Sequence, residues 1–220
     1  MFTVIINFKA YRESSGERAL KLAKAVEEVS KKTDFYLAVA PNYLDVSYII
    51  KETSLDVFAQ HVDAVTYGSY TGRITPEMLK ERGLKGSLIN HSERRLKLAD
   101  IEFIVSKLRE LDLVSIVCTN NTPTTAAAAA LNPDYVAVEP PELIGSGIPV
   151  SKAEPEIVEN SVKAAKSVNR NVKVLCGAGI SKYEDIVAAM DLGAEGVLLA
   201  SGVVKASDPK KALEELVGLR

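Results

Sequence analysis

The chain of 220 residues lacks a strong net charge, because 27 Lys and Arg residues stand against 29 Asp and Glu residues. A nucleic-acid-binding domain usually carries a basic surface, so this balance argues against nucleic acid as a partner. The short basic cluster "SERRLK" (residues 92–97) is interpreted as the solvated face of a helix.

Cysteine is scarce, and both residues, Cys118 and Cys176, lie at the end of an apolar run. Two buried thiols are typical of a protein from a reducing compartment. Long apolar runs are also missing. The first residues, "MFTVIINFKAY", have no basic region, and Asn7 and Lys9 interrupt their apolar run. This pattern predicts neither a signal peptide nor a membrane span, so we expect a soluble, cytoplasmic protein without a membrane partner.

Histidine is as scarce as cysteine, with His61 and His91 as the two residues. His61 stands in "QHVD" beside Asp63 and could be imagined as a metal ligand. No third ligand follows at a spacing typical of a metal site. We therefore expect no metal site.

The apolar residues that are present form eight short runs, each followed by a stretch with helical periodicity. In residues 14–32, for example, Ala19, Leu22, Ala23, Val26 and Val29 recur on one helical face, with serines available to cap the helix. The runs occupy residues 3–8, 35–41, 56–62, 86–92, 114–120, 135–139, 172–179 and 195–201.

Strict alternation of buried strands and helices favours parallel βαβ units. Eight such units close naturally into a (β/α)8 barrel, the architecture known as the TIM barrel, and residues 1–220 are predicted to form one such domain. An open, doubly wound sheet is the main alternative, because periodicity alone cannot show closure.

Polar residues at the carboxyl ends of the strands are the candidate site, because chemistry in such barrels lies there. Lys9 follows the first run, His91 the fourth and Glu139 the sixth. A helix beginning at Ser92 or Glu93 would disfavour a charged imidazole, so we expect His91 to be neutral and to donate a hydrogen bond. Each side chain also has a plain structural interpretation: a solvated lysine, a histidine satisfied by backbone groups, and a carboxylate in a cap or surface ion pair.

The carboxylate of Glu139 ends an apolar strand, so burial is expected to raise its pKa toward the range of a useful base. The loop that follows, residues 140–151, is longer than most βα loops, which indicates a lid, and its Gly145, Ser146 and Gly147 can form an anion nest. The small-residue loops "CGAGIS" and "LLASG" after the last two runs are typical of a phosphate site.

These motifs resemble the triosephosphate isomerase family over the whole chain: "NFK" (residues 7–9), "NHSERR" (residues 90–95), "VEPPELIGSG" (residues 138–147) and the last loop. The compact length and "CGAGIS" resemble its archaeal branch. The resemblance implies interconversion of dihydroxyacetone phosphate and glyceraldehyde 3-phosphate, a step of glycolysis and gluconeogenesis, through an enediolate and without a cofactor. It implies a catalytic base at Glu139, an electrophile at His91, an electrostatic residue at Lys9 and a supporting carboxylate at Glu93. The substrate contacts it implies are Asn7, Phe8, Lys9, Ile144, Gly145, Gly179, Ala200 and Ser201.

The chain departs from the more familiar members of that family at two places. Glu142 stands where they have a tryptophan, and residues 176–179 replace Tyr-Gly-Gly-Ser. By the same resemblance, residues 65–76 are expected to project into a neighbouring subunit of a homo-oligomer, a homotetramer or a dimer. The alternatives are another phosphate-binding barrel enzyme, an aldolase with a Schiff base on Lys9, and an inactive barrel used for binding.

Overall fold

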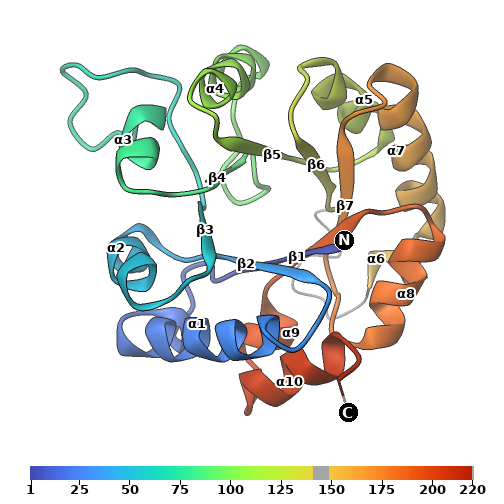
Figure 1. The fold of residues 1–220 in the computed structure, drawn as a ribbon. Helices are drawn as coiled ribbons and strands as arrows, with labels where there is room; N and C mark the ends of the chain where they lie inside the picture. The colour runs from blue at the N-terminus through green and yellow to red at the C-terminus, as the bar shows by residue number, and fades with distance from the viewer. Residues whose placement is uncertain (141–148, 220) are drawn as a thin grey trace.

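The computed structural model describes residues 1–140 and 149–219. Parallel strands form a closed barrel in which each strand pairs with the next in sequence and the last pairs with the first (Figure 1). The strands are β1 (Thr3–Asn7), β2 (Tyr36–Ala40), β3 (Asp56–Ala59), β4 (Gly86–Ile89), β5 (Val114–Thr119), β6 (Tyr135–Val138), β7 (Lys173–Gly177) and β8 (Gly196–Leu199).

Closure of the barrel is visible in the register of β1, where Ile5 aligns with Ala38 of β2 on one side and with Leu198 of β8 on the other. The predicted (β/α)8 barrel is therefore confirmed over the open sheet. That residues 1–220 form a single domain stays a prediction.

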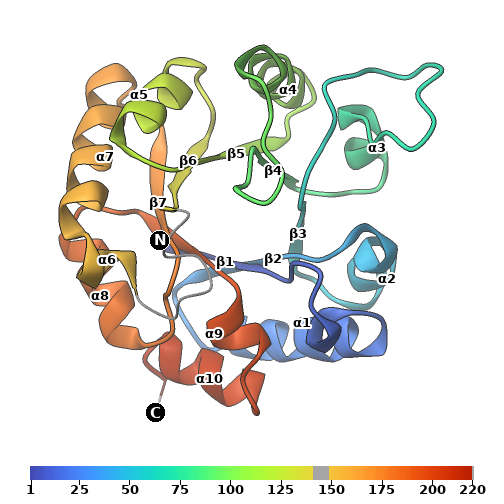
Figure 2. The ribbon, with the colours of Figure 1, turned by 180° about the vertical axis from the view of Figure 1, so that it is seen from behind.

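Helices surround the strands on the outside of the barrel, as the two opposite views show (Figures 1 and 2). Because each crossover returns the chain to the same end, every strand runs in the same direction. The helices are η1 (Arg12–Ser14, a short 3-10 turn), α1 (Glu17–Ser30), α2 (Tyr43–Glu52), α3 (Pro76–Glu81), α4 (Leu98–Glu110), α5 (Thr122–Ala130), α6 (Val150–Ala153), α7 (Pro155–Val168), α8 (Tyr183–Asp191), α9 (Ser201–Val204) and α10 (Pro209–Leu216).

The core has two layers, and this explains why the strands are apolar at almost every position. Ile5 belongs to a cluster inside the barrel, whereas Val4 and Ile6 belong to the larger cluster between the barrel and its helices. Successive side chains of a strand point to opposite faces, so both faces of β1 are buried. The two cysteines, Cys118 and Cys176, are free and buried in these layers.

Helix α1 buries the face that its periodicity predicted, namely Ala19, Leu22, Ala23, Val26 and Val29. Its expected serine cap is wrong. The residue before the helix is Gly16, whose N–H donates to the Asp45 carboxylate at 3.0 Å. The hydroxyl of Ser14 turns away and donates to the carbonyl of Phe8 at 2.6 Å. The Asp45 carboxylate, from a distant part of the chain, thus takes the place of the expected serine cap.

The helix expected from Ser92 is also wrong, because α4 begins at Leu98 and residues 91–97 form a turn. The side chain of Asn90 accepts the N–H of Leu96 at 2.9 Å, and the Arg95 guanidinium donates to the Asn90 carbonyl at 3.0 Å. These bonds close the segment into a loop in place of a helical turn. The basic cluster is therefore not a helix face.

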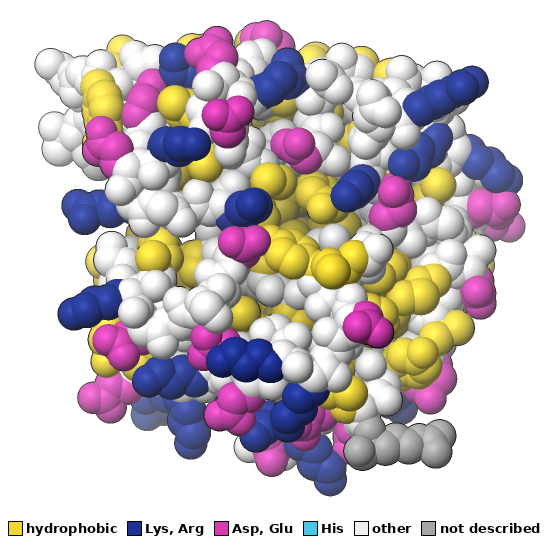
Figure 3. All heavy atoms as spheres, in the orientation of Figure 1, with side chains coloured by type: hydrophobic (Ala, Val, Ile, Leu, Met, Phe, Trp, Pro, Cys, Tyr) yellow, Lys and Arg dark blue, Asp and Glu magenta, His cyan; other side chains and the backbone are white. Residues whose placement is uncertain are grey.

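The surface carries charged side chains of both signs, interspersed around a more apolar centre in the view of Figure 3. The segment between β3 and α3 extends outward beyond its neighbours (Figure 1), and Tyr67 and Tyr70 in it are each 51% exposed. Within the two described ranges, no helix has the length and apolar character needed to cross a membrane.

Candidate active site

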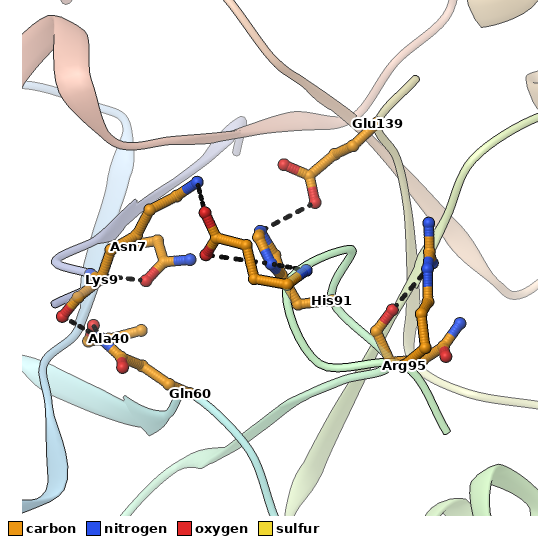
Figure 4. A network of polar contacts seen from close by, with 9 residues as sticks. Asn7, Lys9, Ala40, Gln60, His91, Arg95 and Glu139 are labelled. Atoms are coloured by element: carbon orange, nitrogen blue, oxygen red, sulfur yellow. Dashed lines mark hydrogen bonds and ion pairs between the residues drawn. The ribbon is translucent and has the colours of Figure 1, made fainter. Parts of the chain in front are cut away.

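The carboxyl ends of parallel strands meet at one end of a barrel, and the predicted side chains converge there. Asn7 ends β1 and Lys9 lies two residues on, His91 comes shortly after β4, and Glu139 follows β6 directly. In Figure 4 the side chains of Lys9 and His91 lie near the Glu139 carboxylate. Residues that are far apart in sequence therefore form one cluster.

Lys9 has a strained backbone that its neighbours hold in place. Its φ of 49° lies in the left-handed region that few non-glycine residues adopt. The Asn7 side chain accepts its N–H at 3.0 Å, and the Gln60 amide donates to its carbonyl at 3.0 Å (Figure 4). Its ammonium donates to the Glu93 carboxylate at 2.8 Å. Sequence reasoning missed Gln60, because a polar residue in the third run gave no sign of this contact.

Backbone strain gathers around the cluster. Among the described non-glycine residues with positive φ, Lys9, Asn90 and Ala178 follow β1, β4 and β7. The other two, Asp112 and Asn132, follow the ends of helices, where a left-handed residue is ordinary. Strain held at strand ends without such a local reason is typical of functional sites.

The ring of His91 has a defined tautomer. Its Nδ1 accepts the backbone N–H of Glu93 at 3.2 Å, so Nδ1 carries no proton and the ring proton lies on Nε2. The Glu93 carboxylate is also 3.5 Å from Nδ1 and would favour a proton there. The hydrogen bond from the backbone determines which ring nitrogen accepts, because the Glu93 carboxylate is 57% exposed and already pairs with Lys9. Nε2 is therefore the ring nitrogen placed to donate, while the neutral state of His91 stays a prediction; the helix N-terminus on which it was based is a turn.

The carboxylate of Glu139 is buried, with only 6% of the residue exposed. Burial raises its pKa, and the neighbouring His91 and Lys9 side chains oppose this shift only in part. Its Oε2 lies 3.6 Å from Nε2 of His91 (Figure 4), which is too long for a hydrogen bond. Neither atom has a hydrogen-bond partner among the described residues. Buried polar atoms are rarely left unpaired, so this pair is suited to a ligand that binds between or beside them.

Glycine at position 177 makes room for the carboxylate. A Cβ there would lie 2.2 Å from Cγ of Glu139 and 2.8 Å from its Oε1, distances that atoms without a bond do not reach. Sequence reasoning assigned Gly177 to a small-residue loop and missed this role. Its only signal was a glycine at the last position of a buried strand.

A cavity joins Lys9 and Glu139, though not His91, to the loops after β7 and β8. Its lining includes Asn7, Lys9, Glu139, Gly179, Ala200 and Ser201. The two loops lie close together, as Gly202 shows: a Cβ on this residue would lie only 2.7 Å from the carbonyl oxygen of Ile180. Tyr11 also lines the cavity and was not predicted.

Two other parts of the prediction fall elsewhere. Phe8 is completely buried in the outer core, and its backbone N–H donates to the carbonyl of Ala40 at 3.0 Å. Ile144 and Gly145, with the rest of the expected nest and Glu142, lie outside the described residues. Among residues 1–140 and 149–219, no group of three or more His, Cys, Asp or Glu side chains is arranged to hold a metal ion.

Comparison with known proteins adds an independent observation. The family model described as triosephosphate isomerase matches residues 2–217. The chain belongs to the triosephosphate isomerase family. A triosephosphate isomerase from Archaeoglobus fulgidus is 72% identical over 219 residues, which cover 100% of this chain and 98% of the relative. Those from Methanothermus fervidus and Methanocaldococcus jannaschii are 60% and 56% identical, with 97% of this chain covered in each case and 96% and 98% of the relative.

The resemblance to the archaeal branch of triosephosphate isomerases is thereby confirmed. The loop after β7, where this chain departs from the more familiar Tyr-Gly-Gly-Ser, places both Ala178 and Gly179 at positive φ, 70° and 72°. Ala178 therefore takes a conformation that suits glycine better. This loop therefore carries backbone strain at Ala178.

Proposed function

We propose that the protein interconverts dihydroxyacetone phosphate and D-glyceraldehyde 3-phosphate, as an aldose–ketose isomerase of glycolysis and gluconeogenesis. One observation carries the proposal beyond family membership: at the carboxyl end of the barrel, Oε2 of Glu139 and Nε2 of His91 are buried, lie 3.6 Å apart and have no hydrogen-bond partner among the described residues. A base and a hydrogen-bond donor in that arrangement can act on adjacent atoms of one small substrate.

In this mechanism Glu139 is the base. Its carboxylate removes a proton from the carbon next to the carbonyl, and the electron pair moves to the carbonyl oxygen to form an enediolate. The proton on the hydroxyl oxygen of the enediolate then moves to the former carbonyl oxygen, and the protonated carboxyl group returns a proton to the neighbouring carbon. A pKa raised by burial supports this role, because it makes the carboxylate a stronger proton acceptor. The substrate carbonyl takes up the electron pair, so the steps involve no cofactor.

His91 and Lys9 are proposed to stabilise the charge that develops on the substrate oxygens. The proton on Nε2 of His91 is available, since this atom has no other partner among the described residues. Lys9 would bring its ammonium to the same cavity, and Glu93 would support it through the 2.8 Å contact. Asn7 fixes the backbone of Lys9 and lines the cavity.

The phosphate is proposed to bind backbone amides of the β7 and β8 loops, at Gly179, Ala200 and Ser201, which line the same cavity. Ile144 and Gly145 are proposed as further contacts. Small residues let amides approach a phosphate closely. An enediolate beside a phosphate can expel it, and holding the phosphate while water is excluded would suppress that loss.

A coupled assay with glyceraldehyde 3-phosphate tests the proposed activity, with 2-phosphoglycolate as the inhibitor. We expect turnover that this inhibitor abolishes competitively. A protein that binds 2-phosphoglycolate without isomerising the triose phosphates would contradict the proposal and point to another phosphate-binding barrel or an inactive one. Covalent trapping on Lys9 by borohydride in the presence of substrate would point to a Schiff-base aldolase.

We also propose a homo-oligomer, a homotetramer in preference to a dimer, that works in the cytoplasm. The outward segment with its half-exposed Tyr67 and Tyr70 supports a contact with a second copy. Light scattering during size-exclusion chromatography should give a mass of two or four chains. An active monomer would contradict this part of the proposal.

A further inference from the structure

Tyr11 and Lys205 form a stacked pair at the side of the active-site cavity. The Lys205 ammonium lies 4.2 Å from the centroid of the Tyr11 ring, well inside the range of a cation–π interaction. Tyr11 lines the same cavity as Lys9, Gly179 and Ser201. The pair therefore places a positive charge behind one wall of the cavity.

Local contacts hold both partners of this pair. The carbonyl of Tyr11 accepts the N–H of Ser14 at 3.2 Å, and the Ser14 hydroxyl ties the same loop to Phe8. On the other side, the N–H of Lys205 donates to the carbonyl of Ser201 at 3.1 Å, at the end of α9. Figure 2 shows α9 beside the ring of strands, inward of α10. The backbone of Lys205 is thus tied to the segment that begins with Ser201, and its ammonium reaches Tyr11 from there.

Lys205 differs from Lys9 in its charge balance. Lys9 is paired with Glu93 at 2.8 Å, whereas no ion pair of Lys205 occurs among the described residues, and its side chain is exposed. An ammonium on a flexible stem normally samples many positions. Stacking on Tyr11 restricts it without neutralising it, so its positive charge stays directed at the cavity wall.

We propose that Tyr11 and Lys205 form a charged wall of the phosphate-binding end of the cavity, in which Lys205 favours doubly negative phosphate ligands and Tyr11 holds it in position. This rests on the proposed function, since it takes the substrate phosphate to bind beside Gly179 and Ser201. The ammonium acts through its charge and touches no reacting atom. Its attraction should strengthen binding of substrate and transition state alike, and salt should screen it.

The variant Lys205→Met removes the charge and keeps an apolar stem. At low ionic strength we expect the KM for glyceraldehyde 3-phosphate and the dissociation constant of 2-phosphoglycolate, the latter measured by calorimetry, to rise by about 2- to 5-fold. We expect kcat to stay near the wild-type value, because uniform binding is lost. The difference from wild type should shrink at high salt. Tyr11→Leu should show the same pattern, and Lys205→Arg should restore binding.

Lys173→Met is the matched control, because Lys173 stacks on Tyr135 at 5.5 Å at the opposite end of the barrel, where β6 and β7 begin. This variant should bind 2-phosphoglycolate as wild type does. Wild-type affinity in Lys205→Met, or equal weakening in both lysine variants, would overturn the charged wall. Calorimetry needs no turnover, so a wild-type protein that binds 2-phosphoglycolate but does not isomerise triose phosphates would overturn the proposed function alone.

Discussion

The two histidines occupy similar places but very different surroundings. Each follows a strand by two residues, His61 after β3 and His91 after β4, and each is followed two residues later by a carboxylate. At His61 the groups satisfy one another: Nε2 lies 3.3 Å from Asp63, and the Tyr43 hydroxyl donates to the His61 carbonyl. At His91, Nε2 lies 3.6 Å from Oε2 of Glu139, and neither atom has a hydrogen-bond partner in the part of the chain that the structure describes.

Asp63 shows how complete the pairing is in the first region. It accepts hydrogen bonds from Arg73 at 2.7 Å and from the Ile74 N–H at 2.8 Å, and Arg94 lies 3.7 Å away. Burial alone would raise its pKa, but these bonds and His61 hold the value at about 2. In the second region, burial raises the pKa of Glu139. The same residue types therefore form a fully hydrogen-bonded cluster around His61, and around His91 a buried pair whose facing atoms have no hydrogen-bond partner among the described residues.

The largest expected effect comes from Glu139→Gln, which removes the proposed base and keeps the shape of the side chain. We expect kcat to fall by about 10²–10⁴-fold, the usual contribution of a positioned base. The coupled isomerase assay measures this. Asp63→Asn makes the same chemical change in the hydrogen-bonded cluster around His61 and should leave kcat near wild type.

Glu139→Gln should also gain stability near neutral pH. The folded pKa of Glu139 is raised above its ordinary value of 4.5, so between these two values the folded state binds more protons than the unfolded state. Stability therefore falls as pH rises through that interval. Glu139→Gln should unfold at a higher temperature than wild type at pH 8, and the difference should vanish as pH falls to 4.5. A variant that is less stable at pH 8 would contradict the raised pKa of the carboxylate.

Next in size is the contrast between His91→Gln and His61→Gln. Loss of a preorganised donor to a developing oxyanion costs about 10²–10³-fold in kcat, which we expect for His91. His61→Gln should lose about 1 kcal/mol of stability and little activity. Steady-state kinetics and urea denaturation of both variants separate the two effects. Equal losses of kcat would remove the distinction between the regions.

Asp63→Asn should lower the free energy of unfolding by about 2 kcal/mol at neutral pH, because the folded pKa of about 2 lies below the ordinary value of 3.8. This contribution is complete above pH 3.8 and is lost as pH falls through 2. The denaturation curves of variant and wild type should therefore differ at pH 7, lie closer together at pH 2.5 and converge only below pH 2. A constant difference at both values would show that charge is not the cause.

The smallest effect is expected from Ala178→Gly, which relieves a positive φ beside the buried pair of Glu139 and His91. The gain should reach up to about 1 kcal/mol, because the strain relieved is partly offset by the greater freedom of glycine in the unfolded chain. The urea midpoint should rise while KM and kcat stay close to wild type. A lower midpoint would mean that the Ala178 methyl contributes packing that outweighs its strain.

The sequence was sufficient for the barrel and for bringing three candidate site residues to one end of it, for a physical reason. Strand and helix periods are local properties, so the alternation and the buried face of α1 could be read directly, and the strand ends placed Lys9, His91 and Glu139 at one end of a barrel. The two local errors, the serine cap of α1 and the helix from Ser92, arose where tertiary contacts of Asp45 and Asn90 determine the backbone.

What could not be predicted depends on contacts between distant segments. The space that Gly177 leaves for Glu139 joins β7 to the end of β6. The clamp of Gln60 on the Lys9 backbone joins β3 to β1, and the stack of Lys205 on Tyr11 joins the two ends of the chain. The residue spacing within a single helix or strand does not predict contacts between distant segments, so these parts of the site could be identified only in the folded structure.

Proton exchange tests the central claim most directly. The protein is incubated in D₂O with dihydroxyacetone phosphate, and deuterium incorporation at the carbon next to the carbonyl is followed by NMR for wild type and Glu139→Gln. If Glu139 is the base that acts beside His91, wild type incorporates deuterium and the variant does so at least about 10²-fold more slowly. Exchange by Glu139→Gln at the wild-type rate would contradict the account.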